Sequence, residues 1–163
     1  MRIIGIDPGY AIIGFGVLDY ENGRFSTLGF GVVTTPSQMA FEDRLAVIFR
    51  DICELMEKYH PDYMAIEKLY FNTNTTTAID VAQARGVILL AAVKYSVRIR
   101  EYTPLQVKSA ITGYGRAEKA QMMEMVRKML RLPGVPKPDD TADALAMAIC
   151  HAFYSGAPSI DRK

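Results

Sequence analysis

The first apolar segment of the chain is short, rich in branched residues and closed by an acid. Ile3, Ile4 and Ile6 stand before Asp-Pro-Gly at 7–9, a pattern that predicts a buried strand with Asp7 at its carboxyl end. A buried carboxylate is costly unless a basic side chain or a metal ion meets it. Asp-Pro-Gly is also an ordinary turn sequence, so the role of Asp7 depends on what lies near it.

Two longer β-type segments follow, residues 12–20 and 24–35, joined by Glu21-Asn22-Gly23. Asn-Gly favours a type I′ hairpin because both central residues of that turn need positive φ. The first three strands are therefore expected to form an antiparallel meander. Glycine weakens a strand and marks places where backbone or ligand comes close, and the two segments contain Gly14, Gly16, Gly29 and Gly31.

Apolar residues recur at intervals of three and four between residues 39 and 59, which predicts an amphipathic helix. His60-Pro61 ends this helix, and residues 62–67 form a short apolar segment that finishes on Glu67. A strand, a helix and a second strand form a crossover, so this fourth strand is expected to be parallel to the first. Asp7 and Glu67 would then lie side by side at the carboxyl ends of neighbouring strands.

The second half of the chain is mostly helical in pattern. After a polar loop at 72–77, an Ala-rich segment reaches about residue 96 and is apolar on more than one side, so we expect a partner chain to cover part of it. The remaining predicted elements are a strand at 97–103, a short helix at 105–111 opened by Pro104, a helix at 117–130 and a last helix that begins at Asp139.

Several residue types that often carry chemistry are interpreted as structural in this chain. Methionines at helical spacing usually pack in a core. Two distant cysteines without metal-ligand spacing are typical of buried thiols in a reducing compartment. The residues concerned, together with two histidines, are Met122, Met123, Met125, Met129, Cys53, Cys150, His60 and His151.

The length of 163 residues and a hydrophobic content of 50% suit one domain, 1–163, whose last few residues we expect to be disordered. The longest apolar run, 86–93, is too short to span a bilayer, and Met1-Arg2 leads into a strand rather than a signal peptide. These features predict a soluble, cytoplasmic protein that does not associate with a membrane.

The net charge of +1 conceals an uneven distribution along the chain. Residues 82–137 hold 11 basic and 3 acidic side chains, whereas acids predominate on either side of this segment. Solvated helix faces explain most charge runs of this kind. A basic middle between acidic ends also suits a metal-dependent site beside a polyanion.

Three aspartates open the last predicted helix: Asp139, Asp140 and Asp143. Acids in a first turn are favoured by capping and by the helix dipole, but three exceed what a cap requires. Asp140 and Asp143 share one face of the helix because of their spacing, so both can point at one ion.

Together the predicted elements follow the order β-β-β-α-β-α-β-α-α-α. The chain resembles the RuvC-type Holliday junction resolvases, which are crossover junction endodeoxyribonucleases of the ribonuclease H-like fold, over nearly its whole length. The resemblance implies a five-stranded mixed α/β sheet flanked by helices, with strands four and five parallel to strand one. The motifs that carry it are Gly-Ile-Asp-Pro-Gly at 5–9, Ala-Ile-Glu at 65–67, Gln-Ala-Arg-Gly at 83–86, Gln-Val-Lys at 106–108, Lys-Ala-Gln at 119–121 and Asp-x-x-Asp-Ala-Leu-Ala at 140–146.

The resemblance also implies roles for individual residues. Basic groups facing DNA would be Lys108 and Lys119, with Arg116 as a further DNA contact where the family often has a small capping residue. Asp139 is an extra acid beside the family pattern. The implied catalytic and metal-binding carboxylates are Asp7, Glu67, Asp140 and Asp143.

Tyr70 stands where the family carries an aromatic side chain beside the active site. Its ring is expected to stack on a base that is already partly unstacked at the branch point. The alternative is that Tyr70 and Phe71 form a hydrophobic lid on the end of the sheet.

The implied activity is paired phosphodiester hydrolysis during DNA recombination and repair. Two hard cations about 3.5–4 Å apart can support such a reaction, and carboxylates are the ligands that they prefer. The expected cofactor is therefore a pair of Mg²⁺ ions, for which Mn²⁺ can substitute. The implied partners are four-way junction DNA, a second copy in a homodimer and a branch-migration helicase complex.

Three other functions share parts of this pattern. The first turn and Gly14-Phe15-Gly16 also resemble the phosphate-binding hairpin of actin-like kinases, but those proteins need two such domains. A catalytically silent junction-binding protein would not need the acids. A ribonuclease H-like nuclease that acts on RNA or on an RNA–DNA hybrid is the closest alternative.

Overall fold

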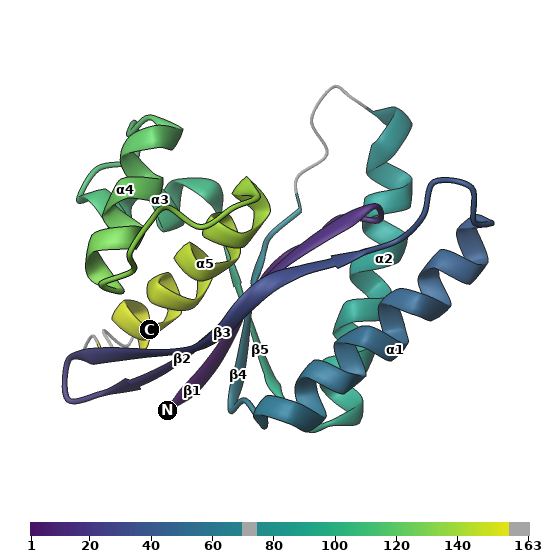
Figure 1. The fold of residues 1–163 in the computed structure, drawn as a ribbon, viewed down its shortest axis with the longest axis horizontal. Coiled ribbons are helices and arrows are strands. Elements are labelled where there is room, and N and C mark those ends of the chain that lie inside the picture. The colour runs from purple at the N-terminus through teal and green to yellow at the C-terminus, as the bar shows by residue number, and fades with distance from the viewer. Residues whose placement is uncertain (70–74, 157–163) are drawn as a thin grey trace, which may run out of the picture.

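A computed structural model of the chain describes residues 1–69 and 75–156, in which a five-stranded sheet lies between two layers of helices (Figure 1). None of the helices in these ranges is long and apolar enough to cross a membrane. The elements follow the predicted order and are β1 (Arg2–Asp7), β2 (Ile12–Glu21), β3 (Arg24–Thr34), α1 (Phe41–Tyr59), β4 (Tyr63–Glu67), α2 (Thr75–Lys94), β5 (Arg98–Tyr102), α3 (Pro104–Thr112), α4 (Lys119–Met129) and α5 (Asp139–Gly156).

The strands lie in the order β3-β2-β1-β4-β5. β2 pairs antiparallel with both β1 and β3, whereas β4 pairs parallel with both β1 and β5. Asn22 and Gly23 have φ angles of 51° and 77°, as a type I′ turn requires. The predicted mixed sheet is therefore confirmed, and β1 is its central strand.

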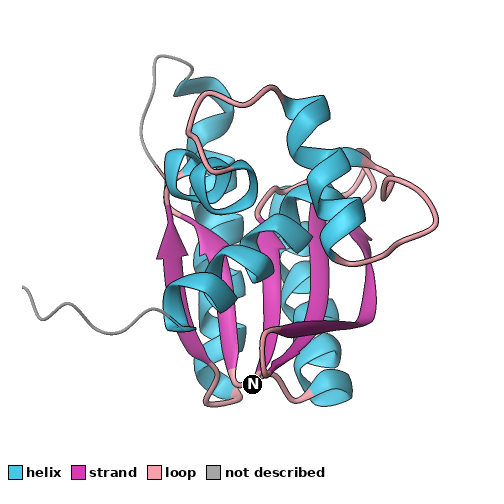
Figure 2. Ribbon diagram, turned by 90° about the vertical axis from the view of Figure 1, so that its left-hand side faces the viewer, coloured by secondary structure: helices cyan, strands magenta, loops and turns pink. Residues whose placement is uncertain are grey.

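Helices cover both faces of the sheet, with α1 and α2 on one face and α3, α4 and α5 on the other (Figures 1 and 2). Ile4 lies in the core beneath α1 and α2, whereas Ile3 and Ala65 lie in the core beneath α5. Side chains alternate between the two faces along a strand. Asp7 and Glu67 stand an even number of positions beyond Ile3 and Ala65, so both carboxylates emerge on the α5 side.

Glycines in β1 and β2 let α5 approach the sheet closely. A Cβ atom on Gly5 would lie 1.9 Å from the carbonyl oxygen of Ala144, and one on Gly14 would lie 2.0 Å from that of Asp140. A Cβ atom on Gly16 would collide with a leucine side chain of the same helix. The sequence did not show whether backbone or a ligand comes close to Gly14. In the structure it is the backbone of α5 that does so.

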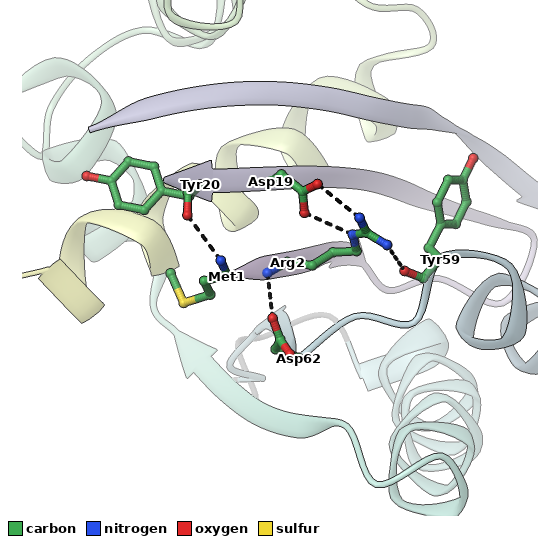
Figure 3. A network of polar contacts seen from close by, with 6 residues as sticks. All are labelled: Met1, Arg2, Asp19, Tyr20, Tyr59 and Asp62. Carbon is green, nitrogen blue, oxygen red and sulfur yellow. Dashed lines mark hydrogen bonds and ion pairs between the residues drawn. The ribbon is translucent and has the colours of Figure 1, made fainter. Parts of the chain in front are cut away.

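The start of β1 is fixed by a polar network at the end of the strand opposite Asp7 (Figure 3). The guanidinium of Arg2 donates to both carboxylate oxygens of Asp19, at 2.9 and 3.0 Å, and to the carbonyl oxygen of Tyr59 at 2.7 Å. The backbone N–H of Arg2 donates to the carboxylate of Asp62 at 2.7 Å. These bonds tie β1 to β2 and to the connection between α1 and β4, and they help to fix its register in the sheet.

Several helix boundaries differ from the prediction. α1 begins at Phe41 instead of residue 39, and α2 begins at Thr75, within the predicted loop at 72–77. α4 begins at Lys119 instead of residue 117, because Ala117 is buried and Glu118 keeps an extended backbone with φ −70° and ψ 153°. α2 ends at Lys94 instead of near residue 96, since Ser96 has a left-handed φ of 58°, a conformation that terminates helices.

The residues interpreted as structural pack as expected. His60 ends α1 in a left-handed conformation. His151 is buried with its Nδ1 2.7 Å from the hydroxyl of Tyr102, and burial, followed by the charge of Arg100, lowers its pKa to about 4. Of the cysteines and methionines interpreted as structural, four are buried in the core, Cys53, Cys150, Met122 and Met123, and two pack partly buried against it, Met125 and Met129.

Candidate active site

The register of the sheet brings Asp7 and Glu67 together. β1 and β4 pair in parallel up to Ile6 and Ile66, and the next residue of each strand is the carboxylate. Ligands of sheets with parallel strands characteristically bind beyond the carboxyl ends of those strands. The two acids therefore lie side by side, as predicted, at the carboxyl ends of β1 and β4, where a ligand can bind.

The start of α5 brings two further carboxylates, Asp140 and Asp143, to the same end of the sheet. The N–H of Thr141 donates to the carbonyl oxygen of Pro138 at 3.0 Å, and its hydroxyl donates to that of Gly31 at 3.4 Å. The second bond connects the start of the helix to β3. The position of these acids therefore depends on how closely α5 packs on the sheet.

A pocket of about 210 Å³ opens beside the carboxylates. Its polar members include three of the four predicted metal ligands and both lysines that were expected to face DNA. Asp140 does not contribute to the lining, although its charge acts on both Asp7 and Asp143. The lining residues are Asp7, Glu67, Pro104, Val107, Lys108, Lys119, Met122, Asp143 and Met147.

The carboxylates repel one another in a partly buried setting. Burial, and then the charges of three neighbouring carboxylates, raise the pKa of Asp7 to about 7. Burial, and then the charge of Asp143, raise the pKa of Glu67. Burial also raises the pKa of Asp143, although Lys119 acts in the opposite direction. A bound cation would relieve this repulsion, because opposite charge favours the ionised form of each acid.

Lys119 contacts the carboxylate cluster directly. Its Nζ lies 3.2 Å from the carboxylate of Asp143 and 3.5 Å from that of Asp139. Burial lowers the pKa of this ammonium group, but attraction to the two aspartates outweighs burial and raises the pKa overall. The side chain is 55% exposed, so a protonated Lys119 is also accessible to an anionic ligand.

The carboxylate of Asp139 pairs with two lysines, Lys119 and Lys137. Besides Lys119, it pairs with Lys137, whose Nζ lies 3.4 Å from its carboxylate. The hydrogen bond from Lys137, assisted by the charge of Lys119, lowers the pKa of Asp139. Two lysines already pair with Asp139, and it does not line the pocket. Asp143 lines the pocket and the charge of Asp140 acts on Asp7, so Asp139 is a weaker candidate for a metal ligand than either.

The donor chemistry of the pocket fits a hard divalent cation. Carboxylate oxygens are the ligands that Mg²⁺ and Mn²⁺ prefer, and the raised pKa values reflect burial first and then the concentration of negative charge. Among the residues that the structure describes, no three His, Cys, Asp or Glu side chains are arranged as a complete ligand set. Asp143 pairs with Lys119, so cation binding would compete with this ion pair.

Two described residues do not line the pocket: Arg116, which was predicted to contact DNA, and Arg85, which had no predicted role. Arg116 is exposed in the loop between α3 and α4. Tyr70 and Phe71 lie outside the described residues. Arg85 received no role from sequence reasoning, yet its Nε donates to the carbonyl oxygen of Glu67 at 3.2 Å. The only sequence signal for Arg85 was its place in the motif at 83–86.

Comparisons with known proteins identify the family of the chain. The chain matches the family model of crossover junction endodeoxyribonuclease RuvC over residues 3–151. The crossover junction endodeoxyribonuclease RuvC of Alkaliphilus oremlandii is 55% identical over 152 residues, which cover 93% of this chain and 93% of that protein.

Solved structures give the same result. The structure of Thermus thermophilus RuvC is similar with a TM-score of 0.88 and 36% identity, covering 95% of each chain. A structure of T. thermophilus RuvC in complex with Holliday junction substrate has a TM-score of 0.87 and 34% identity, again covering 95% of each chain. The similarity therefore extends over the whole sheet and both helix layers.

Proposed function

Because the chain belongs to the RuvC family of crossover junction endodeoxyribonucleases, we propose that it is a metal-dependent endonuclease that resolves Holliday junctions in DNA recombination and repair. The observation that carries the proposal is the meeting of Asp7, Glu67 and Asp143 with Lys108 and Lys119 in one pocket. Such an enzyme would work in the cytoplasm beside a branch-migration helicase complex, with no need of a membrane.

In this proposal the carboxylates hold and orient a pair of Mg²⁺ ions, for which Mn²⁺ can substitute. When bound, such ions activate water, neutralise charge on the phosphoryl oxygens and stabilise the leaving oxygen. Lys108 and Lys119 contact phosphates near the cut and hold the backbone of the DNA against the acids. The proposed metal ligands are Asp7, Glu67, Asp140 and Asp143.

The experiment that tests the proposal is strand-by-strand mapping of cuts in a four-way junction. Each strand is labelled in turn, and the junction is incubated with the pure protein in Mg²⁺ or in excess chelator. We expect nicks in two opposite strands in Mg²⁺ and an intact junction in chelator. An intact junction in Mg²⁺, or equal cutting in chelator, would refute a metal-dependent resolvase.

A nuclease for RNA or for an RNA–DNA hybrid is the second candidate. It is favoured by the ribonuclease H-like sheet alone, because the carboxylate arrangement does not itself distinguish DNA from RNA. The junction complex of a relative at 34% identity supports the branched DNA substrate over this alternative.

Replacing either Lys108 or Lys119 with Ala is expected to lower cleavage roughly ten- to hundredfold. Hydrogen bonds to charged groups contribute about 1.5–3 kcal/mol, and the slope of log affinity against log salt should fall by about 1 when a phosphate contact is lost. Single-turnover cleavage and binding across a salt series measure both quantities. Lys128→Ala is the control, since Lys128 pairs with Glu124 on the same helix; an equal loss in the control would exclude a specific role.

We also propose that the chain forms a homodimer. A junction has approximate two-fold symmetry and must be cut in two like strands, whereas one chain supplies one set of acids, so a two-fold dimer would present two sets. α2 exposes Ile79, Leu90 and Val93 at 61%, 58% and 64%. Leu90 also lines an apolar groove between α1 and α2 with Leu45, Ala46, Phe49 and Val87.

Light scattering should therefore give the mass of a dimer for the wild type and that of a monomer for Leu90→Glu. A charge in the apolar groove would be buried unpaired at the interface, which is strongly unfavourable. Leu28→Glu, at an exposed position of β3, should leave the dimer intact. A wild-type monomer that still makes paired cuts would contradict the proposed dimer.

Tyr70 is proposed to stack on a base at the branch point. Stacking of this kind contributes roughly 1–3 kcal/mol per base, so Tyr70→Ala should reduce cleavage about tenfold or more, while Tyr70→Phe keeps the ring and should be nearly neutral. Turnover on a mobile junction is the measurement, with thermal unfolding as the control. If Tyr70→Ala loses activity only in proportion to the loss of folded protein, Tyr70 belongs to a hydrophobic lid on the end of the sheet instead.

A further inference from the structure

Arg85 of α2 links the end of β4 to the edge strand β5. Its Nε donates to the carbonyl oxygen of Glu67 at 3.2 Å, and its Nη2 pairs with the carboxylate of Glu101. The Arg85 side chain is 12% exposed, whereas that of Glu101 is 42% exposed. The guanidinium is therefore largely buried and is held on two sides.

The backbone of β4 explains why the carbonyl group of Glu67 needs this partner. The N–H of Lys68 donates to the carbonyl oxygen of Tyr102 in β5 at 2.9 Å. Backbone polar groups alternate in direction along a strand. The carbonyl group of Glu67 is therefore directed to the opposite side of β4, where β1 lies.

β1 cannot supply a donor at this position. Its pairing with β4 ends at Ile6 and Ile66, and continuing the ladder by one step would require the N–H of residue 8. That residue is Pro8, which has no N–H. A partly buried carbonyl oxygen without a donor is unfavourable, and Arg85 supplies the donor that Pro8 lacks.

We propose that Arg85 is a positioning residue that fixes the end of β4, so that the carboxylate of Glu67 faces Asp7 and a divalent cation. The inference rests on the proposed function, because it assigns Glu67 to cation binding. A group that orients a metal ligand through its own hydrogen bonds typically changes metal affinity or activity 10- to 100-fold when it is removed.

Two other roles of Arg85 predict different results. A simple brace between α2 and the sheet would affect stability without affecting cation affinity. A direct contact with DNA phosphate would weaken junction binding in chelator and reduce the salt dependence of affinity, again without a change in cation affinity.

The test compares wild type with Arg85→Met, Arg85→Lys and Glu101→Gln. Electron paramagnetic resonance measures Mn²⁺ binding to the DNA-free protein. Single-turnover kinetics give the Mg²⁺ concentration for half-maximal junction cleavage, and thermal unfolding in chelator reports on folding. Arg127→Met is a matched control, because Arg127 also bridges a carboxylate, that of Glu124, and a carbonyl oxygen, that of Leu132 at 3.3 Å.

Arg85→Met should raise the dissociation constant for Mn²⁺ and the half-maximal Mg²⁺ concentration by roughly tenfold or more. Junction affinity in chelator should stay unchanged, and saturating Mg²⁺ should restore much of the rate. Arg85→Lys keeps a hydrogen-bond donor but lacks the planar guanidinium, so its dissociation constant for Mn²⁺ should lie between those of wild type and Arg85→Met. Glu101→Gln retains the bond to Glu67 and should shift cation affinity less than Arg85→Met does.

Unchanged Mn²⁺ affinity in Arg85→Met would overturn the inference, as would an equal shift in Arg127→Met. If Arg85→Met does not fold, the same comparison applies to Arg85→Lys, whose Mn²⁺ affinity must then be weaker than that of Glu101→Gln. A wild type that binds Mn²⁺ but cuts no junction would refute the proposed function, and the Mn²⁺ comparison would still decide the role of Arg85.

Discussion

Asp7→Asn is expected to lower junction cleavage by on the order of a thousandfold, because metal ions stabilise the transition state by several kcal/mol and each 1.4 kcal/mol is a factor of ten in rate. An amide carries no charge and is a poorer ligand for a hard cation. Junction affinity in chelator should be kept, since losing a negative charge cannot weaken attraction to phosphate. Single-turnover cleavage and equilibrium binding measure the two effects, and Glu67→Gln, Asp140→Asn and Asp143→Asn should behave alike. A wild-type rate for Asp7→Asn would contradict the metal mechanism.

Thermal unfolding in chelator shows whether Asp7→Asn has lost ligand chemistry or merely its fold. The folded pKa of Asp7 is raised from 3.8 to about 7, so between these values the folded chain holds a proton that the unfolded chain has released. Stability of the wild type therefore falls as pH rises through this window. The amide introduced by Asp7→Asn does not ionise, so the variant should be more stable than wild type at about pH 8 and gain less at about pH 5. An equal difference at both pH values would contradict the pKa assigned to Asp7.

Gly5→Ala is expected to destabilise the protein by about 3 kcal/mol, because overpacking against backbone cannot be relieved by a side-chain rotation. The added Cβ would lie 1.9 Å from the carbonyl oxygen of Ala144 and 2.8 Å from the backbone nitrogen of Ala148. α5 would have to move away from β1, and it carries Asp140 and Asp143 with it. Denaturant unfolding gives the stability, and cleavage by the remaining folded protein should also fall.

Gly86→Ala is the matched control for Gly5→Ala. A Cβ atom on Gly86 would meet nothing within 4 Å, and Gly86 lies within α2. Replacing glycine by alanine inside a helix stabilises it by roughly 0.5–1 kcal/mol. Opposite signs of the two effects would support close packing of α5 on β1, whereas a neutral Gly5→Ala would contradict it.

The strands and the pairing of Asp7 with Glu67 could be predicted because local signals determine them. Asn22-Gly23 determines the hairpin, and the helix between β3 and β4 determines the parallel crossover that aligns the two acids. Period-two alternation then places both carboxylates on one face. Each step uses residues close together in the sequence, together with a general rule of handedness or pleat.

Contacts between distant segments could not be predicted in the same way. The sequence marked Gly14 as a point of close approach, but only the packed structure identifies the backbone at Asp140 as the partner. The sequence marked Asp139 as an extra acid, but only the packed structure places Lys137 and Lys119 against it. Arg85 was hidden for a related reason, because its partner is a carbonyl group of Glu67 and backbone groups have no sequence signature.

Substrate preference tests directly whether this carboxylate pocket cuts branched DNA with the help of a divalent cation. The measurement is the cleavage rate of the pure wild-type protein on a four-way junction, an RNA–DNA hybrid and a plain DNA duplex of matched sequence, each in Mg²⁺ and in chelator. We expect paired cuts in the junction in Mg²⁺ alone and little cleavage of the other two substrates. Faster cleavage of the hybrid than of the junction, or cleavage of the junction in chelator, would contradict the account.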